Sequence, residues 1–394
     1  MSEKTEYDMR VYYKDSNLDI TKEMIDLMSS SDRLKFLIGA GCSHVTDLPL
    51  MEGLTTQIVD EVDKVKDNPI MKHVRGIFSG EDSRSIERYM SAIVGYQSVI
   101  DKMKQSKIDE PYIIMRSNKD MKGNKKVQAE DLKVQAEDLE GLLDIIKQEI
   151  LNIIGKKEVC TFHHQNFVKG IHRHLFAGKK NKTVDYFVLN YDTLIEDALG
   201  LEEIRYQDGF EGSATGWWNP KLLEEQKDYS RVLKIHGSID WCLLDEENWT
   251  LRRVRSQVKT KKQVPVLIYP NSTKYQEIQR NPFDTLMAIM RSTLSEPKQT
   301  VLVICGYSFN DSHINAVIED AIHVSKGELT VMAFINEDEP TEQLEKWRIS
   351  SISDQIKIYT NKGVFHGEGR GKGKGPFEWG KFEVLSKLIG GDGR

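Results

Sequence analysis

Three short motifs place polar side chains directly after apolar runs of the kind that form buried strands. FLIGAGCS carries a glycine-rich turn, LNYDTLIE carries Asn190 and Asp192, and KIHGSIDW carries His236. An amide can orient water or a hydroxyl group, a carboxylate can stabilise a developing cation, and an imidazole can accept a proton. These three side chains are the candidate catalytic residues, although Asp192 would also serve as an ordinary helix cap.

The glycine-rich turn and two later motifs are candidates for binding a ligand. Glycines allow the backbone to approach a phosphate closely, and successive N–H groups at the start of a helix attract an anion. CGYSFND repeats the strand–turn–helix pattern, and FINE ends another strand run in polar groups. Helix capping by Asn310 or Asp311 is the ordinary alternative for CGYSFND. The candidate ligand-binding residues are Gly39, Ala40, Gly41, Cys42, Ser43, Gly306, Ser308, Asn310 and Asn336.

The elements that must position these residues are typical of an α/β fold. The apolar runs are mostly continuous rather than alternating, as in parallel strands buried on both faces, and helical patterns separate several of them. The first turn lacks the GxGxxG spacing of an ordinary dehydrogenase and the GK[ST] of an ATPase loop, so neither class is favoured. The expected strands are Leu34–Ile38, Tyr186–Leu189, Val232–Ile235, Val264–Tyr269, Val301–Cys305, Leu329–Ile335 and Ile356–Tyr359.

Two regions depart from this alternation. Between Thr55 and Gly178 the strand runs vanish, which predicts a helical insertion, and the tandem heptads Val127–Glu140 within it are coiled-coil-like. The glycine alternation over 367–375 predicts a flexible loop before a C-terminal helix. We therefore predict an N-terminal segment (1–30), a Rossmann-like domain (31–360) with a helical insertion (55–178), and a glycine-rich loop with a C-terminal helix (361–394).

Composition is typical of a globular protein of the cytoplasm. The chain has 394 residues, of which 39% are hydrophobic and 29% charged, and no apolar run approaches the length of a membrane-spanning helix. The first residues contain no apolar stretch that would indicate secretion. The net charge of -6 argues against direct nucleic-acid binding, and the basic cluster over 252–262 is expected to be an exposed hairpin or loop.

The cysteines predict neither disulfides nor a metal site. There are four, and no two of them form a CxxC pair. Zinc sites and disulfide frameworks need closer or regular spacing, so we expect buried, reduced thiols and no bound metal. They are Cys42, Cys160, Cys242 and Cys305.

Five motifs resemble the sirtuin family and appear in the family's order, from about Phe36 to Glu337. They are GAG-x-S, Asn-x-Asp, His-Gly, Gly-x-Ser and a strand ending in Asn. The residues of these motifs are most similar to those of the sirtuin-like domains of bacterial anti-phage defence proteins, above all the stand-alone subunit that partners a HerA-type ATPase. The resemblance implies that residues 31–360 bind NAD as substrate and release nicotinamide, which starves an infected cell. It places Asn190, His236 and Asp192 at the reacting centre, pyrophosphate on the first turn, and an adenosine ribose beside Asn336.

Two departures from the family pattern leave alternatives open. Protein-deacylating sirtuins carry a four-cysteine zinc module and a glutamine before Asn-x-Asp, whereas this chain lacks the cysteines and has Leu189 there. NAD hydrolysis is therefore the leading hypothesis. ADP-ribosyl transfer or deacylation on the same pocket, and a non-enzymatic NAD or ADP-ribose sensor, are the alternatives. Because nothing in the chain resembles a fused sensor domain, we expect a homo-oligomer controlled by another protein, and a HerA-like ATPase is the expected partner.

Overall fold

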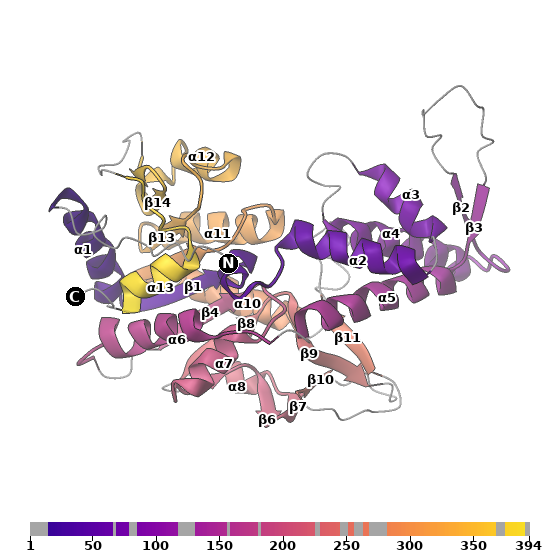
Figure 1. Ribbon diagram of the computed structural model, residues 1–394, viewed down its shortest axis with the longest axis horizontal. Coiled ribbons are helices and arrows are strands. Elements are labelled where there is room, and N and C mark those ends of the chain that lie inside the picture. The colour runs from indigo at the N-terminus through magenta and orange to yellow at the C-terminus, as the bar shows by residue number, and fades with distance from the viewer. Residues whose placement is uncertain are drawn as a thin grey trace, which may run out of the picture.

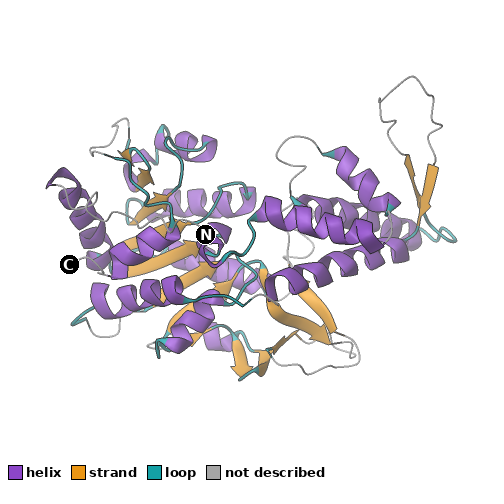
Figure 2. Ribbon diagram, in the orientation of Figure 1, coloured by secondary structure: helices purple, strands orange, loops and turns teal. Residues whose placement is uncertain are grey.

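An eight-stranded sheet forms the centre of the molecule (Figures 1 and 2). All neighbouring strands in it are parallel except the last two, β14 and β15. The predicted α/β class with a Rossmann-like parallel sheet is therefore confirmed. In spatial order the strands are β15 (Gly363–Phe365), β14 (Ile356–Thr360), β13 (Leu329–Phe334), β12 (Thr300–Cys305), β1 (Arg33–Ile38), β4 (Val184–Val188), β8 (Ser230–Lys234) and β5 (Tyr206–Gln207). The computed structural model describes residues 15–65, 68–78, 85–116, 131–155, 158–179, 183–224, 229–244, 251–255, 263–267, 282–367 and 375–390.

Most residues of the central strands are apolar because both faces of the sheet are covered. In β1, Phe36 and Ile38 point into one core and Leu37 into the other, and β12 alternates in the same way. One face packs against α1 (Asp15–Ser30), α6 (Phe162–Lys169), the π-helix η5 (Gly170–Leu175), α7 (Leu194–Leu201) and α13 (Phe382–Gly390). The other packs against α8 (Lys221–Glu224), α10 (Phe283–Leu294), α11 (Ser312–Ser325) and α12 (Glu342–Arg348).

A helical insertion follows the turn after β1 and extends away from the sheet (Figure 1). It has its own apolar core, to which all four of its helices contribute. These elements are α2 (Met51–Val65), α3 (Pro69–Ile77), α4 (Ile86–Gln105), the hairpin β2 (Ile113–Arg116) and β3 (Asp131–Val134), and α5 (Ala136–Gly155). No helix in the described part of the chain is long and apolar enough to cross a membrane.

The end of the insertion differs from the prediction. We expected it to run to Gly178, but α6 and η5 pack with α13 against the central sheet. Phe167 and Ile171 are fully buried in the core on that face. Helices that cover the sheet and helices that leave it have similar sequence patterns, so the boundary could not be seen from periodicity.

The tandem heptads do not form a coiled-coil-like element. Of the first copy, residues 131–133 lie in strand β3, which pairs antiparallel with β2, and residues 127–130 lie outside the described residues. Val134, the first residue of the second copy, ends that strand, and helix α5 begins at Ala136. Two copies of one heptad thus adopt different structures because pairing with β2 overrides the local pattern.

One of the predicted strands belongs to a second sheet instead of the central one. We placed Val264–Tyr269 in the parallel sheet, but its described part lies in β11, which pairs antiparallel with β9. Residues 268 and 269 lie outside the described residues. This sheet has the order β11 (Gln263–Leu267), β9 (Gly237–Leu244), β10 (Leu251–Val254), β7 (Thr215–Trp218) and β6 (Phe210–Gly212).

Candidate functional site

The candidate site lies at the carboxyl ends of four adjacent central strands, as expected for a parallel α/β sheet. The strands are in register there, because Ile38 at the end of β1 lies beside both Cys305 of β12 and Val188 of β4. Backbone hydrogen bonds from Leu189 to Ile38 and from Ile235 to Val188, both 2.9 Å long, continue this alignment past the strand ends. The three motifs that contain the candidate catalytic residues therefore converge at one edge of the sheet.

The glycine-rich turn packs against the turn that follows β12. A Cβ atom on Gly39 would lie 2.4 Å from the Gly306 carbonyl oxygen, and one on Gly41 would lie 2.8 Å from the Gly306 Cα atom. Gly306 has a positive φ of 64°, and its own Cβ would lie 2.4 Å from the Cys42 nitrogen. These glycines are therefore needed for close contact between two backbone segments.

Four backbone amides of this turn have acceptors within the protein. The amides of Gly39, Gly41, Cys42 and Ser43 all donate to backbone carbonyl groups, at 2.9 to 3.1 Å. They form a short 3-10 helix (Ala40–Cys42) and tie the turn to its neighbour, so pyrophosphate binding at this turn stays a prediction. Within the turn, Ala40 is exposed and Cys42 is buried in the core of the sheet.

We expect Gly39→Ala to destabilise the fold by about 3 kcal/mol, because the added methyl group overlaps the Gly306 backbone. Gly141→Ala is the matched control: Gly141 lies in α5, and a Cβ atom added there would meet no other atom within 4 Å, so alanine should raise stability by up to about 1 kcal/mol. Chemical denaturation of both variants measures the difference. Unchanged stability of Gly39→Ala would show that the turn has room for more than a hydrogen atom, as a phosphate cradle would need.

Ser43, Asn190 and Asp192 form a buried hydrogen-bonded cluster. The Asn190 Nδ2 atom donates to the Ser43 Oγ atom at 2.6 Å and to the Gly39 carbonyl at 3.0 Å. The Ser43 hydroxyl in turn donates to Asp192 Oδ2 at 2.6 Å. Asp192 Oδ1 also accepts from the Leu194 amide at 3.1 Å, so this carboxylate contacts the first residue of α7, whose N-cap is Thr193, and belongs to the cluster. The sequence alone left these two roles of Asp192 open.

The acceptor atom of the Asn190 side chain, Oδ1, has no hydrogen-bond partner among the described residues. Both hydrogen bonds above are made by Nδ2, and Oδ1 is buried. An unsatisfied buried amide oxygen costs about 1–3 kcal/mol, so a hydrogen bond from a ligand to this atom is favourable. The amide is thus held in one orientation with an acceptor that can receive a hydrogen bond from a ligand or a water molecule.

His236 pairs with a carboxylate from another strand end. Its Nε2 atom lies 3.2 Å from Asp311 Oδ2, and both side chains are buried. Asp311 is the N-cap of α11, where its Oδ1 atom accepts from the amides of His313 and Ile314. A neutral imidazole that donates Nε2–H to this carboxylate keeps its lone pair on Nδ1, so the pair fixes both the tautomer and the orientation of the ring. The sequence identified Asp311 only as a possible helix cap.

His164 is a site neighbour that sequence reasoning missed. It lies on α6, is 1% exposed, and its ring lies close to that of Phe382, with centroids 4.7 Å apart. Burial lowers the pKa of His164 to about 4, with the nearby Asp192 charge acting in the opposite direction. This imidazole is therefore neutral at physiological pH. The only signal in the sequence was a polar pair of histidines in an otherwise ordinary helical pattern.

Cys42 is not a nucleophile in this environment. Burial raises the pKa of its thiol well above the usual value, and the adjacent Cys305 adds to the effect. A thiol with a raised pKa stays protonated, and the thiolate is the reactive form. Cys42, Cys242 and Cys305 are buried free thiols as expected, whereas Cys160 is exposed.

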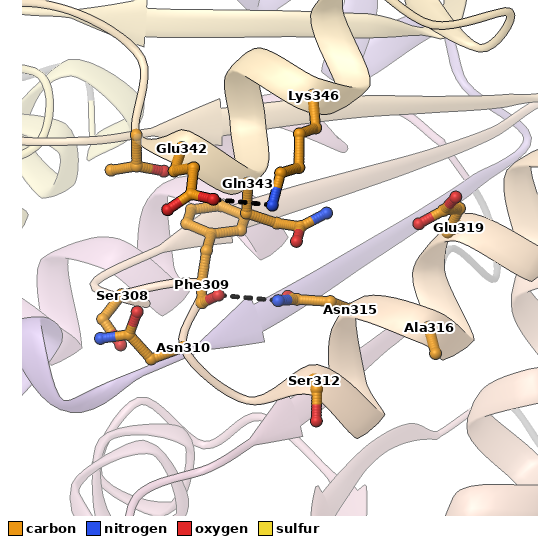
Figure 3. Close-up of a pocket in the computed structure, with 11 residues that line it drawn as sticks. Ser308, Phe309, Asn310, Ser312, Asn315, Ala316, Glu319, Glu342, Gln343 and Lys346 are labelled. Atoms are coloured by element: carbon orange, nitrogen blue, oxygen red, sulfur yellow. Dashed lines mark hydrogen bonds and ion pairs between the residues drawn. The ribbon is translucent and has the colours of Figure 1, made fainter. Parts of the chain in front are cut away.

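The second candidate ligand-binding turn borders a cavity of about 340 Å³ between α11 and α12 (Figure 3). Ser308 and Asn310 line it, together with polar side chains such as Glu319 and Lys346. Gly306, by contrast, is used in packing against Cys42. The turn is held by Asn315, whose Nδ2 atom donates to the Phe309 carbonyl at 2.7 Å. Thus two of the three residues predicted here line this cavity.

Asn336 follows the end of β13 with its side chain exposed. The C-terminal segment packs beside it, because a Cβ on Gly380 would lie 2.3 Å from the Asn336 nitrogen. The Asn336 carbonyl accepts from Asn361 Nδ2 at 3.0 Å. The predicted C-terminal helix is present as α13, and residues 368–374 of the glycine-rich loop lie outside the described residues.

The described arginines of the basic cluster over 252–262 differ in exposure: Arg253 is buried, Arg252 is half-buried and Arg255 is exposed. Arg253 is 7% exposed and pairs with Asp208, and Arg255 donates to Asp240 at 2.6 Å. Residues 256–262 lie outside the described residues. Burial of Arg253 could not be predicted because its acidic partner, Asp208, is distant in sequence.

A buried lysine connects this ionic region to the site. Lys234 Nζ donates to the Asp192 carbonyl and lies 3.6 Å from Glu196 Oε1. Burial raises the pKa of Glu196 to about 7, although Lys234 and Arg255 lower it. The backbone of the Asn190–Asp192 turn is thus held by a cation from the neighbouring strand.

Within the described residues, no three His, Cys, Asp or Glu side chains are grouped so that they could hold a metal ion. We expect elemental analysis of the purified protein to find less than stoichiometric zinc, because the chain offers no cysteine quartet. Chelators should leave its activity unchanged. One zinc per chain would contradict this prediction.

The model of the SIR2-like domain family matches residues 185–353. This stretch contains all three candidate catalytic residues and begins after the glycine-rich turn and the insertion. Over these residues, which make up less than half of the chain, the sequence is therefore similar to the SIR2-like domain family.

Solved structures similar to the chain include a Sir2 homolog–NAD complex, with 12% identity, a TM-score of 0.41, and coverage of 93% of this chain and 92% of that one. Another is a mutant Sir2 homologue in complex with 2′-O-acetyl ADP ribose, with 14% identity, a TM-score of 0.39, and coverage of 93% and 94%. None of the curated proteins matches the chain.

Proposed function

We propose that this protein hydrolyses NAD to nicotinamide and ADP-ribose at the carboxyl ends of β1, β4, β8 and β12. Two findings support the proposal: the similarity to the SIR2-like domain family over residues 185–353, and the polar groups gathered at these strand ends. The observation that carries it is the Asn190 side chain, which is fixed by Ser43 and Gly39 while its Oδ1 atom stays buried without a partner among the described residues. Such an acceptor is already oriented before a ligand arrives, so it loses little entropy on binding.

The residues present suit the cleavage of a glycosidic bond to a cationic leaving group. When nicotinamide departs with the electrons of the C–N bond, positive charge develops at ribose C1′, and water must attack from the opposite face. Asn190 would accept a hydrogen bond from that water or from a ribose hydroxyl without adding positive charge. His236, oriented by Asp311, would take the proton that the water loses. Asp192 would stabilise the cation through its negative charge.

The nicotinamide ribose fits this cluster better than the pyrophosphate fits the first turn. The hydroxyl, amide and carboxylate of the cluster are groups that bind sugar hydroxyls, whereas four amides of the turn are occupied by backbone carbonyls. We infer that Ser43 contributes its side chain to the ribose site, and that Ser308 and Asn310 at the cavity contribute to binding the remainder of NAD.

Transfer to an acceptor other than water is the second candidate. Leu189, which stands where deacylating sirtuins have glutamine, is buried in the sheet core and offers no polar group to the site. The purified chain should be incubated with NAD, alone and with an acetylated peptide, and both nicotinamide and ADP-ribose measured. Nicotinamide release without an acceptor supports hydrolysis. Release only with the peptide supports transfer, and binding without release supports a sensor.

We also propose that the protein acts as a homo-oligomer in anti-phage defence and is controlled by a HerA-like ATPase. An uncontrolled NADase would kill its host, so the activity must be gated. The insertion offers a surface for assembly, because it carries large apolar side chains that are 37–59% exposed. Exposed apolar groups that cluster on one part of a molecule are typical of protein interfaces. They are Ile77, Val99, Ile108, Tyr112, Ile114 and Ile145.

For this assembly we expect a solution mass that is a multiple of 45.3 kDa, and NAD turnover that changes when the ATPase is added. Multi-angle light scattering over a range of concentrations gives the mass, and turnover is assayed in the same samples. A monomer with full activity that responds neither to concentration nor to the ATPase would rule out this form of control.

A further inference from the structure

We propose that Tyr191 and Glu87 form a positioning pair through which the helical insertion holds the Asn190–Asp192 turn in its active arrangement. This inference rests on the proposed function, because the turn carries two of the candidate catalytic residues. It assigns a task in the reaction to the insertion, which lies outside the stretch that matches the SIR2-like family.

Tyr191 stands between the two candidate catalytic residues but points into the insertion. Its side chain is 6% exposed and belongs to the apolar core formed by α2, α3, α4 and α5. Its hydroxyl donates to Glu87 Oε1 at 3.0 Å, in a buried hydrogen bond that spans 104 residues of sequence. The side chains on either side, Asn190 and Asp192, both bond to Ser43 at the strand ends. The turn therefore has one anchor in the sheet and one in the insertion.

The backbone of Tyr191 is fixed as well. Its carbonyl accepts from the Ile239 amide at 2.9 Å and from the Ser238 hydroxyl at 3.3 Å. Ile239 itself packs against the insertion core. The segment that follows His236 is thus tied to the segment that follows Asn190, and both contact the insertion. A shift of the insertion would move both halves of the site.

Glu87 is rigidly placed on its own side. It lies in the first turn of α4, whose N-cap is Ser85, and it is 8% exposed. The neighbouring Ile86 amide donates to Thr55 Oγ1 at 2.7 Å, which joins the start of α4 to α2. A carboxylate held this firmly can hold a phenol, because a charge-assisted hydrogen bond in a buried place is stronger than a neutral one.

The charge of Glu87 also acts on the turn that follows β12. Burial chiefly raises the pKa of Tyr307, and the charges of Asp311 and Glu87 add to the effect. The Tyr307 hydroxyl interacts with the Asp311 backbone, at 3.0 Å from its carbonyl and 3.2 Å from its amide, and Asp311 pairs with His236. Glu87 therefore holds the Asn190–Asp192 turn through its hydrogen bond to Tyr191.

The test compares substitutions that remove or keep the hydrogen bond. In Tyr191→Phe and Glu87→Ala we expect kcat for NAD to fall at least about tenfold, because small displacements of reacting groups are costly. Glu87→Gln keeps an acceptor oxygen and should retain most of the activity. The double variant Tyr191→Phe/Glu87→Ala should lose no more than either single variant, since both remove the same bond.

Tyr96→Phe is the matched control. It removes another tyrosine hydroxyl from the insertion, one that lies 3.4 Å from His73 Nε2, and it should leave kcat unchanged. Hydrogen exchange of residues 188–194 gives a readout independent of activity: it should be faster in Tyr191→Phe and unchanged in Tyr96→Phe. Wild-type kcat together with wild-type exchange in Tyr191→Phe would overturn the proposal, as would a rise in kcat. If the wild type has no turnover, the proposed function fails, and hydrogen exchange still decides whether the pair holds the turn.

Discussion

Replacing Asn190 with alanine is expected to lower NAD turnover by at least about 10²-fold, the loss typical of a removed orienting or acid–base group. The side chain supplies the buried acceptor of the site, and alanine removes that acceptor together with the bonds to Ser43 and Gly39. Asn190→Asp should fail as well, although its size is unchanged. A carboxylate there would face the Gly39 carbonyl with an acceptor in place of a donor.

The loss must be separated from unfolding. Asn190→Ala removes two hydrogen bonds, each worth about 1 kcal/mol, so the variant should melt somewhat below the wild type. Asn68→Ala is a matched control, because Asn68 caps α3 by accepting from two backbone amides, and its loss costs about 1 kcal/mol. That variant should show a comparable loss of stability with full turnover. Near wild-type turnover in Asn190→Ala would show that the reacting centre lies elsewhere.

The second large effect is expected at His236, where alanine should also lower turnover at least about 10²-fold. The physical reason is the loss of the proton acceptor that Asp311 orients. Asp311→Asn is the finer test: asparagine can still cap α11, but it no longer offers a carboxylate to Nε2. We expect that variant to fold normally and to lose about tenfold in kcat.

His366→Ala serves as the control for His236→Ala. His366 hydrogen-bonds the Ile356 carbonyl at 2.8 Å near the edge of the sheet, outside the candidate site. Turnover and thermal melting should be measured on all three variants under the same conditions. Full turnover in His236→Ala, or a loss of equal size in His366→Ala, would contradict the assignment of His236 as the proton acceptor.

The parts of the site that could be predicted are those that depend on strand ends. Asn190 and His236 follow continuous apolar runs, and the carboxyl ends of parallel strands meet at one edge of a sheet, so their convergence followed from local pattern. The order of the motifs also indicated the family whose model matches residues 185–353.

What could not be predicted depends on partners that are distant in sequence. The packing of the glycines of the first turn against the Gly306 backbone has no signal in the residues near them. The burial of Lys35 within β1 could not be predicted either. Its charge is compensated by Asp185, which lies 2.6 Å away. The Asp185 pKa, which burial alone would raise, is lowered to about 2 by Lys35 and Arg231. Sequence periodicity does not show such pairs.

The insertion illustrates the same limit on a larger scale. Its existence was evident from the loss of strand runs, but its hairpin was hidden within a heptad repeat, and its contact with the site through Glu87 had no signal in the sequence. A carboxylate in the first turn of a helix is ordinarily a favourable interaction with the helix dipole. Only the fold shows that Glu87 receives the hydroxyl of Tyr191 instead of facing solvent.

The most direct test of the central claim is a mass balance on NAD with the purified chain, in the absence of any peptide or protein acceptor. Nicotinamide and free ADP-ribose are quantified over time by chromatography, with Asn190→Ala measured in parallel. We predict that both products appear in equal amounts, at a rate proportional to enzyme, and that the variant releases at most about a hundredth as much. If NAD stays intact in every assembly state of the wild type, including with the ATPase, or if nicotinamide appears without free ADP-ribose, this protein is not an NAD glycohydrolase.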